Sequence, residues 1–164
     1  MTGPSDVVRA MFDHHLWATA TLIAHLDGLP RERLDEAIPG TYGSIVLTLS
    51  HLLNADARYL LRLTDPDPPP AGEDVARPLA ELASELEDHR GRWNGFLDRL
   101  DAGTLDASIR SRDDYPDVAH AEGLLMLQAI HHGNDHRTQI CSTLGALGLD
   151  VPDLDGWEYW IADR

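Results

Sequence analysis

Three histidines in two distant segments have the residue type and spacing of metal ligands. His132 and His136 lie four residues apart near the C-terminal end of the chain, and His51 lies far upstream. If both segments are helical, His132 and His136 share one face of a helix, and His51 can complete the site from a neighbouring helix. Three protein ligands leave a coordination position open for water or substrate. The pattern therefore favours a reactive metal site over a structural one.

The spacing of the histidine pair is weak evidence by itself. Nine histidines among 164 residues give on the order of half of one such pair by chance. The surroundings strengthen the prediction, because His132 and His136 stand among apolar residues, where an unpartnered imidazole is costly. Gln128 and Gln139 extend the same face by one turn in each direction, so we expect them to form hydrogen bonds around the site.

Helices must position these histidines, and apolar residues recur at helical spacing in four long segments. The predicted helices run from an N-cap at about Ser5 to Asp27, from an N-cap at Ser44 to about Thr64, from about Arg77 to Leu100, and from near Asp117 to Gly145 or Gly148. Consecutive prolines make residues 65–72 a linker between the second and third helices.

Two further segments complete the predicted architecture. The alternating stretch Leu105 to Ile109 could pair as a strand or cross the bundle. The tail, residues 149–164, predicts a short helix that packs on the bundle. The whole pattern predicts an all-α protein, a four-helix bundle with a short C-terminal helix, formed by one domain over residues 1–164.

Composition excludes several classes of partner and site. The formal net charge is −15 and the chain contains no lysine, so nucleic acid and membrane surfaces are not expected partners. Cys141 is the only cysteine, which excludes an intramolecular disulfide and a multi-cysteine metal site. No apolar run approaches the ~20 residues that span a bilayer, and the N-terminus lacks the pattern of a signal peptide. We therefore expect a cytoplasmic protein.

Several motifs follow one another along nearly the whole chain in the order typical of one family. They are the residues from Phe12 to Ala18, Gly43-Ser44-Ile45 ahead of His51, the run from His132 to Gln139, and the run from Leu154 to Tyr159. Together they resemble the DinB-like (YfiT-like) superfamily of helical-bundle metalloenzymes. The resemblance implies that His51, His132 and His136 bind a divalent metal in the core of the bundle.

Two positions depart from the pattern of that family. Asp135 stands where many members have a second histidine before the arginine, and Thr19 stands where many have asparagine. Neither position is one of the three presumed ligands.

The resemblance also suggests an activity, because some relatives are implicated in the chemistry of small thiols. It implies a metal-dependent S-transferase that takes a low-molecular-weight thiol and holds its sulfur as a thiolate. Two alternatives stay open: a metal-dependent hydrolase that uses metal-bound water, and a non-catalytic metal-binding protein of the stress response. Zinc and nickel are the expected metals, and a small-molecule substrate or thiol is the expected partner. The apolar tail could also dock on a second copy and form a homodimer.

Other residues are weaker candidates for the site, and no catalytic residue beyond the ligands is identified. His14 or His15 could face the metal pocket, although surface histidines are commoner, and Tyr59 could line it, although core packing is commoner. Structural roles are expected for the remaining candidates: His131 in packing or at the surface, Arg137 paired with a carboxylate, and Cys141 as buried filler.

Three further groups have no pattern that suggests chemistry. We expect His25, His89 and His120 to face solvent, Trp17, Trp93, Trp157 and Trp160 to anchor packing, and Glu81, Glu85, Glu87 and Asp88 to form a solvated helix face.

Overall fold

Six helices and one small hairpin make up the computed structural model, which describes residues 4–65, 72–101, 110–112, 115–120 and 122–162. The helices are α1 (Pro4–Asp27), α2 (Arg31–Leu34), α3 (Ile45–Thr64), α4 (Leu79–Asp101), α5 (Glu122–Ala146) and α6 (Gly156–Ala162), and the strands are β1 (Arg110–Arg112) and β2 (Tyr115–His120). The predicted all-α class and the short C-terminal helix are confirmed. None of the helices in the described ranges has the length and apolar character that a membrane span requires.

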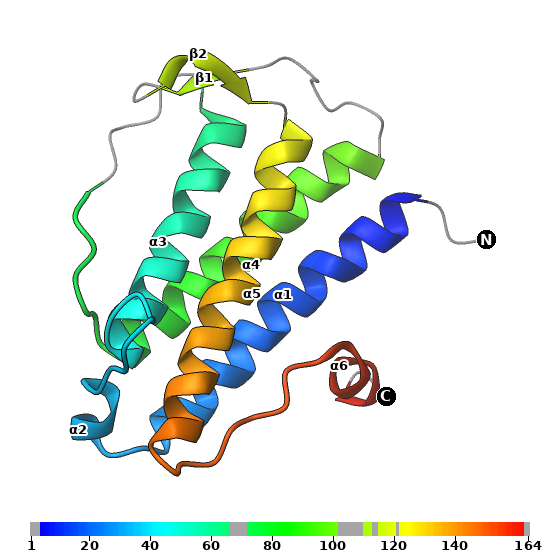
Figure 1. Ribbon diagram of the computed structural model, residues 1–164. Coiled ribbons are helices and arrows are strands. Elements are labelled where there is room, and N and C mark those ends of the chain that lie inside the picture. Colours follow the sequence, from blue (N-terminus) through cyan, green and yellow to red (C-terminus); the bar gives the residue numbers. More distant parts are fainter. Residues whose placement is uncertain (1–3, 66–71, 102–109, 113–114, 121, 163–164) are drawn as a thin grey trace.

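The four long helices pack around a common core. In space α1 contacts α4 and α5, and α3 contacts the same two helices, so that α1, α4, α3 and α5 follow one another around the core. Figure 1 shows α3 and α5 side by side, with the hairpin near the C-terminal end of α3. The centre is filled by side chains from all four helices, among them Phe12, Leu53, Trp93 and Leu144. This arrangement places the two histidine-bearing helices, α3 and α5, next to each other.

Local sequence signals explain where the site-bearing helix α3 begins. The Oγ atom of Ser44 accepts a hydrogen bond from the backbone N–H of Leu47 at 3.3 Å, as the predicted N-cap requires. The apolar positions of α3 then recur at helical spacing and are buried, so His51 is carried at a fixed place along the helix. By contrast, α1 begins at Pro4, so Ser5 lies within the helix and does not cap it.

Two boundaries differ from the predicted ones. The last long helix begins at Glu122, not near Asp117, because residues 115–120 form strand β2, which pairs antiparallel with β1. The backbone of these residues is used for pairing with β1, as in His120 opposite Arg110 and Ala119 opposite Ser111, so it does not continue the helix. The predicted strand or crossing at Leu105 to Ile109 lies outside the described residues. The short helix α2 was not predicted.

The C-terminal segment returns along α1. Gly148 has a φ of +69° and ends α5, with the N–H of Leu149 bonded to the carbonyl of Leu144 at 3.0 Å. Nε2 of His25 then contacts the carbonyl oxygen of Asp150 at 2.9 Å, and Nε2 of His14 contacts that of Leu154 at 2.8 Å. These two bonds hold the segment against the first helix, with α6 beside it (Figure 1).

The four tryptophans do not share one role. Trp93 is fully buried, and its ring centroid lies 4.3 Å from that of Phe12. Trp17 is half-buried against Tyr159. Trp157 and Trp160 are 78% and 57% exposed, so the prediction that they anchor packing is wrong. Helix α6 has no buried residue, which leaves these rings mostly in solvent.

The tryptophans give a direct test of where the core lies. Trp93→Ala removes a buried ring that packs on Phe12 and Phe96, and we expect it to lower the free energy of unfolding by about 3–5 kcal/mol. Trp157→Ala should change it by no more than about 0.5 kcal/mol, because that side chain is exposed. Urea unfolding followed by circular dichroism measures both, and equal effects of the two variants would contradict the packing described.

Candidate metal centre

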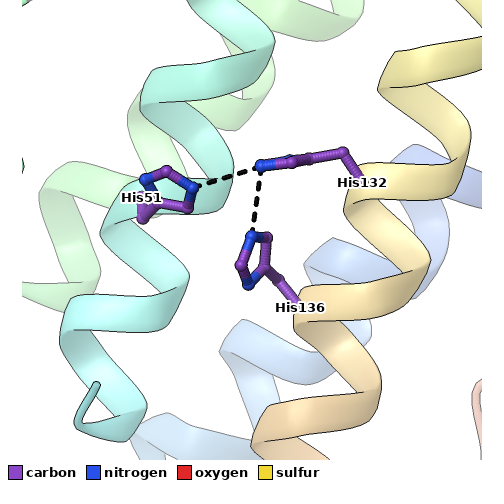
Figure 2. Close-up of side chains that lie close together, drawn as sticks. All are labelled: His51, His132 and His136. Carbon is purple, nitrogen blue, oxygen red and sulfur yellow. Dashed lines mark hydrogen bonds between the residues drawn. The ribbon is translucent and has the colours of Figure 1, made fainter. Parts of the chain in front are cut away.

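The three histidines meet between α3 and α5. His51 projects from α3, and His132 and His136 project from successive turns of α5 (Figure 2). Nε2 of His132 lies 3.1 Å from Nε2 of His51 and 3.1 Å from Nε2 of His136. One nitrogen from each ring falls in a set whose members all lie within 4.8 Å of one another. The structure therefore brings together the three residues that the sequence singles out, and together they could hold a metal ion.

In two of the three imidazole rings, the nitrogen that faces away from the cluster contacts a hydrogen-bond acceptor. Nδ1 of His51 lies 2.6 Å from Oδ2 of Asp74, and Nδ1 of His136 lies 3.3 Å from Oε1 of Gln139. The Gln139 atom must be the oxygen, because it also accepts the backbone N–H of Tyr42 at 2.9 Å. Both rings consequently carry their proton on Nδ1 and present a lone pair at Nε2.

The third ring shows why a cation fits this arrangement. Nδ1 of His132 is buried and makes no hydrogen bond within the described residues. Its Nε2 can carry at most one hydrogen, which can point at His51 or at His136 but not at both. At least one of the two 3.1 Å contacts therefore sets a lone pair against a lone pair. A metal ion among the three nitrogens turns this repulsion into coordination, so the donor set suits a divalent cation that accepts imidazole.

The electrostatics disfavour protonation of the two histidines on α5. Burial, together with the positive charge that His136 or His51 would carry, lowers the pKa of His132 to about 4. Burial and the neighbouring His51 also lower the pKa of His136. Burial alone would raise the pKa of Asp74, but the hydrogen bonds from Asn54, His51 and Tyr42 outweigh it and lower that pKa to about 2. Near neutral pH His132 and His136 therefore favour the neutral form that binds a metal, and the carboxylate of Asp74 lies behind His51.

Two tyrosines enclose the cluster. The ring of Tyr42 stacks on His51 with centroids 3.9 Å apart, and its hydroxyl donates to Oδ2 of Asp74 at 2.9 Å. The ring of Tyr59 stands edge-on to His132, with centroids 5.8 Å apart, and its hydroxyl bonds to Gln128. Tyr59 thus lies against the site, as hypothesised, and both glutamines bond to groups around it. Tyr42 and Asp74 were not predicted.

A second buried polar cluster joins three helices. Nε2 of His15 on α1 lies 2.7 Å from Oδ2 of Asp56 on α3, and Nη1 of Arg137 on α5 donates to Nδ1 of His15 at 3.1 Å and to Oγ1 of Thr19 at 3.0 Å. A guanidinium can only donate, so His15 accepts at Nδ1 and gives its Nε2 proton to Asp56. Burial lowers the pKa of Arg137 to about 10, which still leaves a cation at neutral pH. The cluster therefore combines one anion, one cation and a neutral imidazole.

The contacts in this part of the structure show where several of the weaker candidates for the metal site lie. His15 belongs to it and not to the histidine triad, and His14 bonds to the C-terminal segment instead. Arg137 reaches its carboxylate, Asp56, through His15 and not by a direct hydrogen bond. Thr19, one of the two departures from the family pattern, supplies an acceptor to Arg137.

The remaining candidates have structural or surface positions. His131 is exposed, as predicted, and Cys141 is half-buried against the core, where burial raises the pKa of its thiol. The prediction for His89 is wrong, because this side chain is buried, with Nε2 3.5 Å from Oε1 of Glu85. Glu85 is also half-buried, so the acidic stretch of α4 is not solvated throughout. His25 is half-buried, and the side chain of His120 lies outside the described residues.

Comparison with known families identifies the family of most of the chain. A sequence model described as the DinB superfamily matches residues 14–140, a range that contains His51, His132 and His136 and leaves out α6. A search of curated proteins gave no match.

The close approach of α1 to α5 depends on Gly133, and this dependence is testable. A Cβ atom at position 133 would overlap the imidazole ring of His15 and press on Nη1 of Arg137. We expect Gly133→Ala to lower the free energy of unfolding by about 1–3 kcal/mol, because the buried cluster must shift.

Gly91 provides the matched control. It is an exposed position within α4 where an added Cβ meets nothing within 4 Å. Gly91→Ala should raise stability by about 0.5–1 kcal/mol, since alanine is the better helix former. Chemical denaturation compares the two variants, and a stabilising effect of both would show that α1 and α5 are not in close contact at position 133.

Proposed function

The chain belongs to the DinB superfamily, and we propose that it is a metal-dependent enzyme in which His51, His132 and His136 bind a divalent cation. The observation that carries the proposal is the convergence of three Nε2 atoms, two of them on rings whose Nδ1 atoms are held by acceptors. Such acceptors fix the tautomer and orientation of metal-binding histidines. Zinc and nickel are the proposed metals, since both accept imidazole ligands readily.

We propose further that the enzyme transfers the sulfur of a low-molecular-weight thiol to an electrophilic carbon. A bound divalent cation supplies one thing to this reaction: it lowers the pKa of a coordinated thiol, so that the sulfur is a thiolate near neutral pH. Three protein ligands leave room for that sulfur. The protein's own residues orient the histidines, with Asp74 bonded to His51 and Gln139 bonded to His136.

The surroundings of the triad favour a thiol over water as the nucleophile. Hydrolysis of an ester or amide by metal-bound hydroxide needs a group that gives a proton to the leaving group. The carboxylate that contacts the triad, Asp74, already accepts hydrogen bonds from Asn54, His51 and Tyr42. The phenol of Tyr42 donates its hydrogen bond to this carboxylate. Displacement of a halide by a bound thiolate needs no such proton donor, because the halide leaves as a stable anion.

Metal binding is tested with single substitutions. His51→Ala and His136→Ala each remove one ligand, and we expect the metal content after purification and dialysis to fall from about one equivalent to a small fraction of that. His131→Ala is the matched control, because His131 neighbours His132 on α5 but is exposed. Elemental analysis of the four proteins gives the result. Full occupancy in both ligand variants would mean that the triad is not the metal site.

Activity is tested with the metal-loaded protein, a panel of small thiols and an aryl chloride as acceptor. In the expected reaction the thiolate sulfur bonds to the ring carbon, the carbon–chlorine bond breaks, chloride leaves, and the proton of the thiol passes to the buffer. The rate of thioether formation above background should fall at least about 100-fold in His136→Ala. No thioether with any thiol, together with hydrolysis of an activated ester that depends on the metal, would contradict the transferase and support a hydrolase.

A further inference from the structure

Asp74, which forms a hydrogen bond with His51, is itself oriented by Asn54 and Arg77, and neither of these has a described hydrogen bond to the triad. Asp74 and Arg77 lie on the segment that leads into α4, and Asn54 lies on α3 one turn beyond His51. Nδ2 of Asn54 donates to Oδ1 of Asp74 at 2.8 Å, and Nη2 of Arg77 donates to Oδ1 of Asn54 at 2.9 Å. Four side chains thus form one continuous row of hydrogen bonds, from Arg77 through Asn54 and Asp74 to His51.

The orientation of the Asn54 amide follows from Arg77, and the directions of the other bonds follow from the acceptor character of the Asp74 carboxylate. A guanidinium has donors and no acceptor, so the Asn54 atom that faces Arg77 must be the oxygen. The amide nitrogen of Asn54 then faces Asp74 and donates to Oδ1. With Oδ1 engaged, Oδ2 of Asp74 faces His51 and receives the Nδ1 proton. The lone pair of His51 is left at Nε2, the atom that faces the other two histidines.

Arg77, the first residue of this row of hydrogen bonds, is itself held in place by several contacts. Its Nη1 pairs with Oε2 of Glu85 on α4, and its backbone N–H donates to Oγ of Ser50 on α3 at 3.1 Å. The other carboxylate oxygen of Glu85 lies 3.5 Å from the buried His89. Arg77 is therefore held by groups on two helices, and its side chain is 24% exposed.

We infer that Asn54 and Arg77 are positioning residues for the proposed metal centre, and that they fix, through Asp74, the tautomer of His51 that leaves Nε2 free for the cation. The inference rests on the proposed function as far as the metal is concerned. Its first part, the protonation of His51 at Nδ1, is a property of the metal-free protein and can be measured separately.

Asn54→Asp separates this role from simple packing. The new side chain has nearly the same size and shape and still accepts a hydrogen bond from Arg77, but it cannot donate to Asp74. Two carboxylates then face each other, and Asp74 is driven away from His51. We expect the affinity for Zn²⁺ or Ni²⁺ to fall about 10-fold or more, as is usual when a group that orients a metal ligand is lost.

Asn134→Asp is the control matched in charge and chemistry. Asn134 also accepts a hydrogen bond from an arginine, Arg137, and it lies on α5 between the two ligand histidines, but it has no bond to the triad. Both substitutions add one negative charge near the site, which by electrostatics alone would strengthen cation binding. Weaker binding in Asn54→Asp with unchanged or tighter binding in Asn134→Asp therefore supports the positioning role. Equal effects in the two variants would overturn it.

Two measurements on each protein complete the experiment. Competition with a chromophoric chelator gives the metal affinity, and nitrogen NMR of the metal-free protein shows which ring nitrogen of His51 carries the proton. In the wild type that proton should be on Nδ1, and in Asn54→Asp this preference should be lost. Retention of the Nδ1 proton in Asn54→Asp would refute the inference whether or not the wild type binds metal. Absence of metal binding by the wild type would instead refute the proposed function.

Arg77→Met serves if Asn54→Asp does not fold. Methionine keeps an unbranched apolar stem but removes the donors, so the Asn54 amide loses the group that fixes its orientation. The metal affinity should again fall, whereas Arg33→Met, which breaks the exposed pair with Glu36, should leave it unchanged. An unchanged affinity in Arg77→Met would overturn the inference.

Discussion

The absence of a side chain at position 133 is the constraint on which the arrangement of helices depends. Gly133 lies on α5 between the two ligand histidines, and the ring of His15 from α1 occupies the space where a Cβ would stand. The same ring bonds to Asp56 of α3 and to Arg137 of α5. One close contact therefore sets the distance of α5 from α1, while the buried ion pair bridged by His15 ties both to α3. The triad is assembled on two of these three helices.

The two polar clusters differ in how charge is distributed within them. Around His15 a buried anion and a buried cation balance each other, so no net charge is left in the core. Around the triad a cation would be bound by neutral imidazoles, and the carboxylate of Asp74 lies behind His51. Three neutral ligands would leave the charge of a divalent cation largely uncompensated. A site of this kind suits an anionic sulfur ligand, even in a protein whose net charge is −15.

The sequence predicted the helices and the histidine pair because both depend on short-range regularity, whereas His51 was identified by its place in the family pattern. Helical spacing identified four long helices, and the four-residue separation of His132 and His136 placed them on one face. Asp74 and Tyr42 were missed because they reach the site from irregular segments whose path is set by tertiary contacts, and no periodic pattern leads to them. The burial of His89 was missed for a related reason, since its partner Glu85 is held by Arg77 from outside the helix. The exposed Trp157 shows the converse, an apolar residue that finds no neighbour to cover it.

The location of the ligands on α3 and α5 also has a consequence for folding. His51 and His136 are separated by about half of the chain, a stretch that includes α4 and the hairpin. A cation held by both is a reversible cross-link that closes this long loop, and closing a loop restricts the unfolded chain more the longer the loop is. The stability of the fold and the free concentration of the metal in its surroundings are then thermodynamically linked. If the triad binds the proposed cation, the protein is most resistant to unfolding when that cation is plentiful.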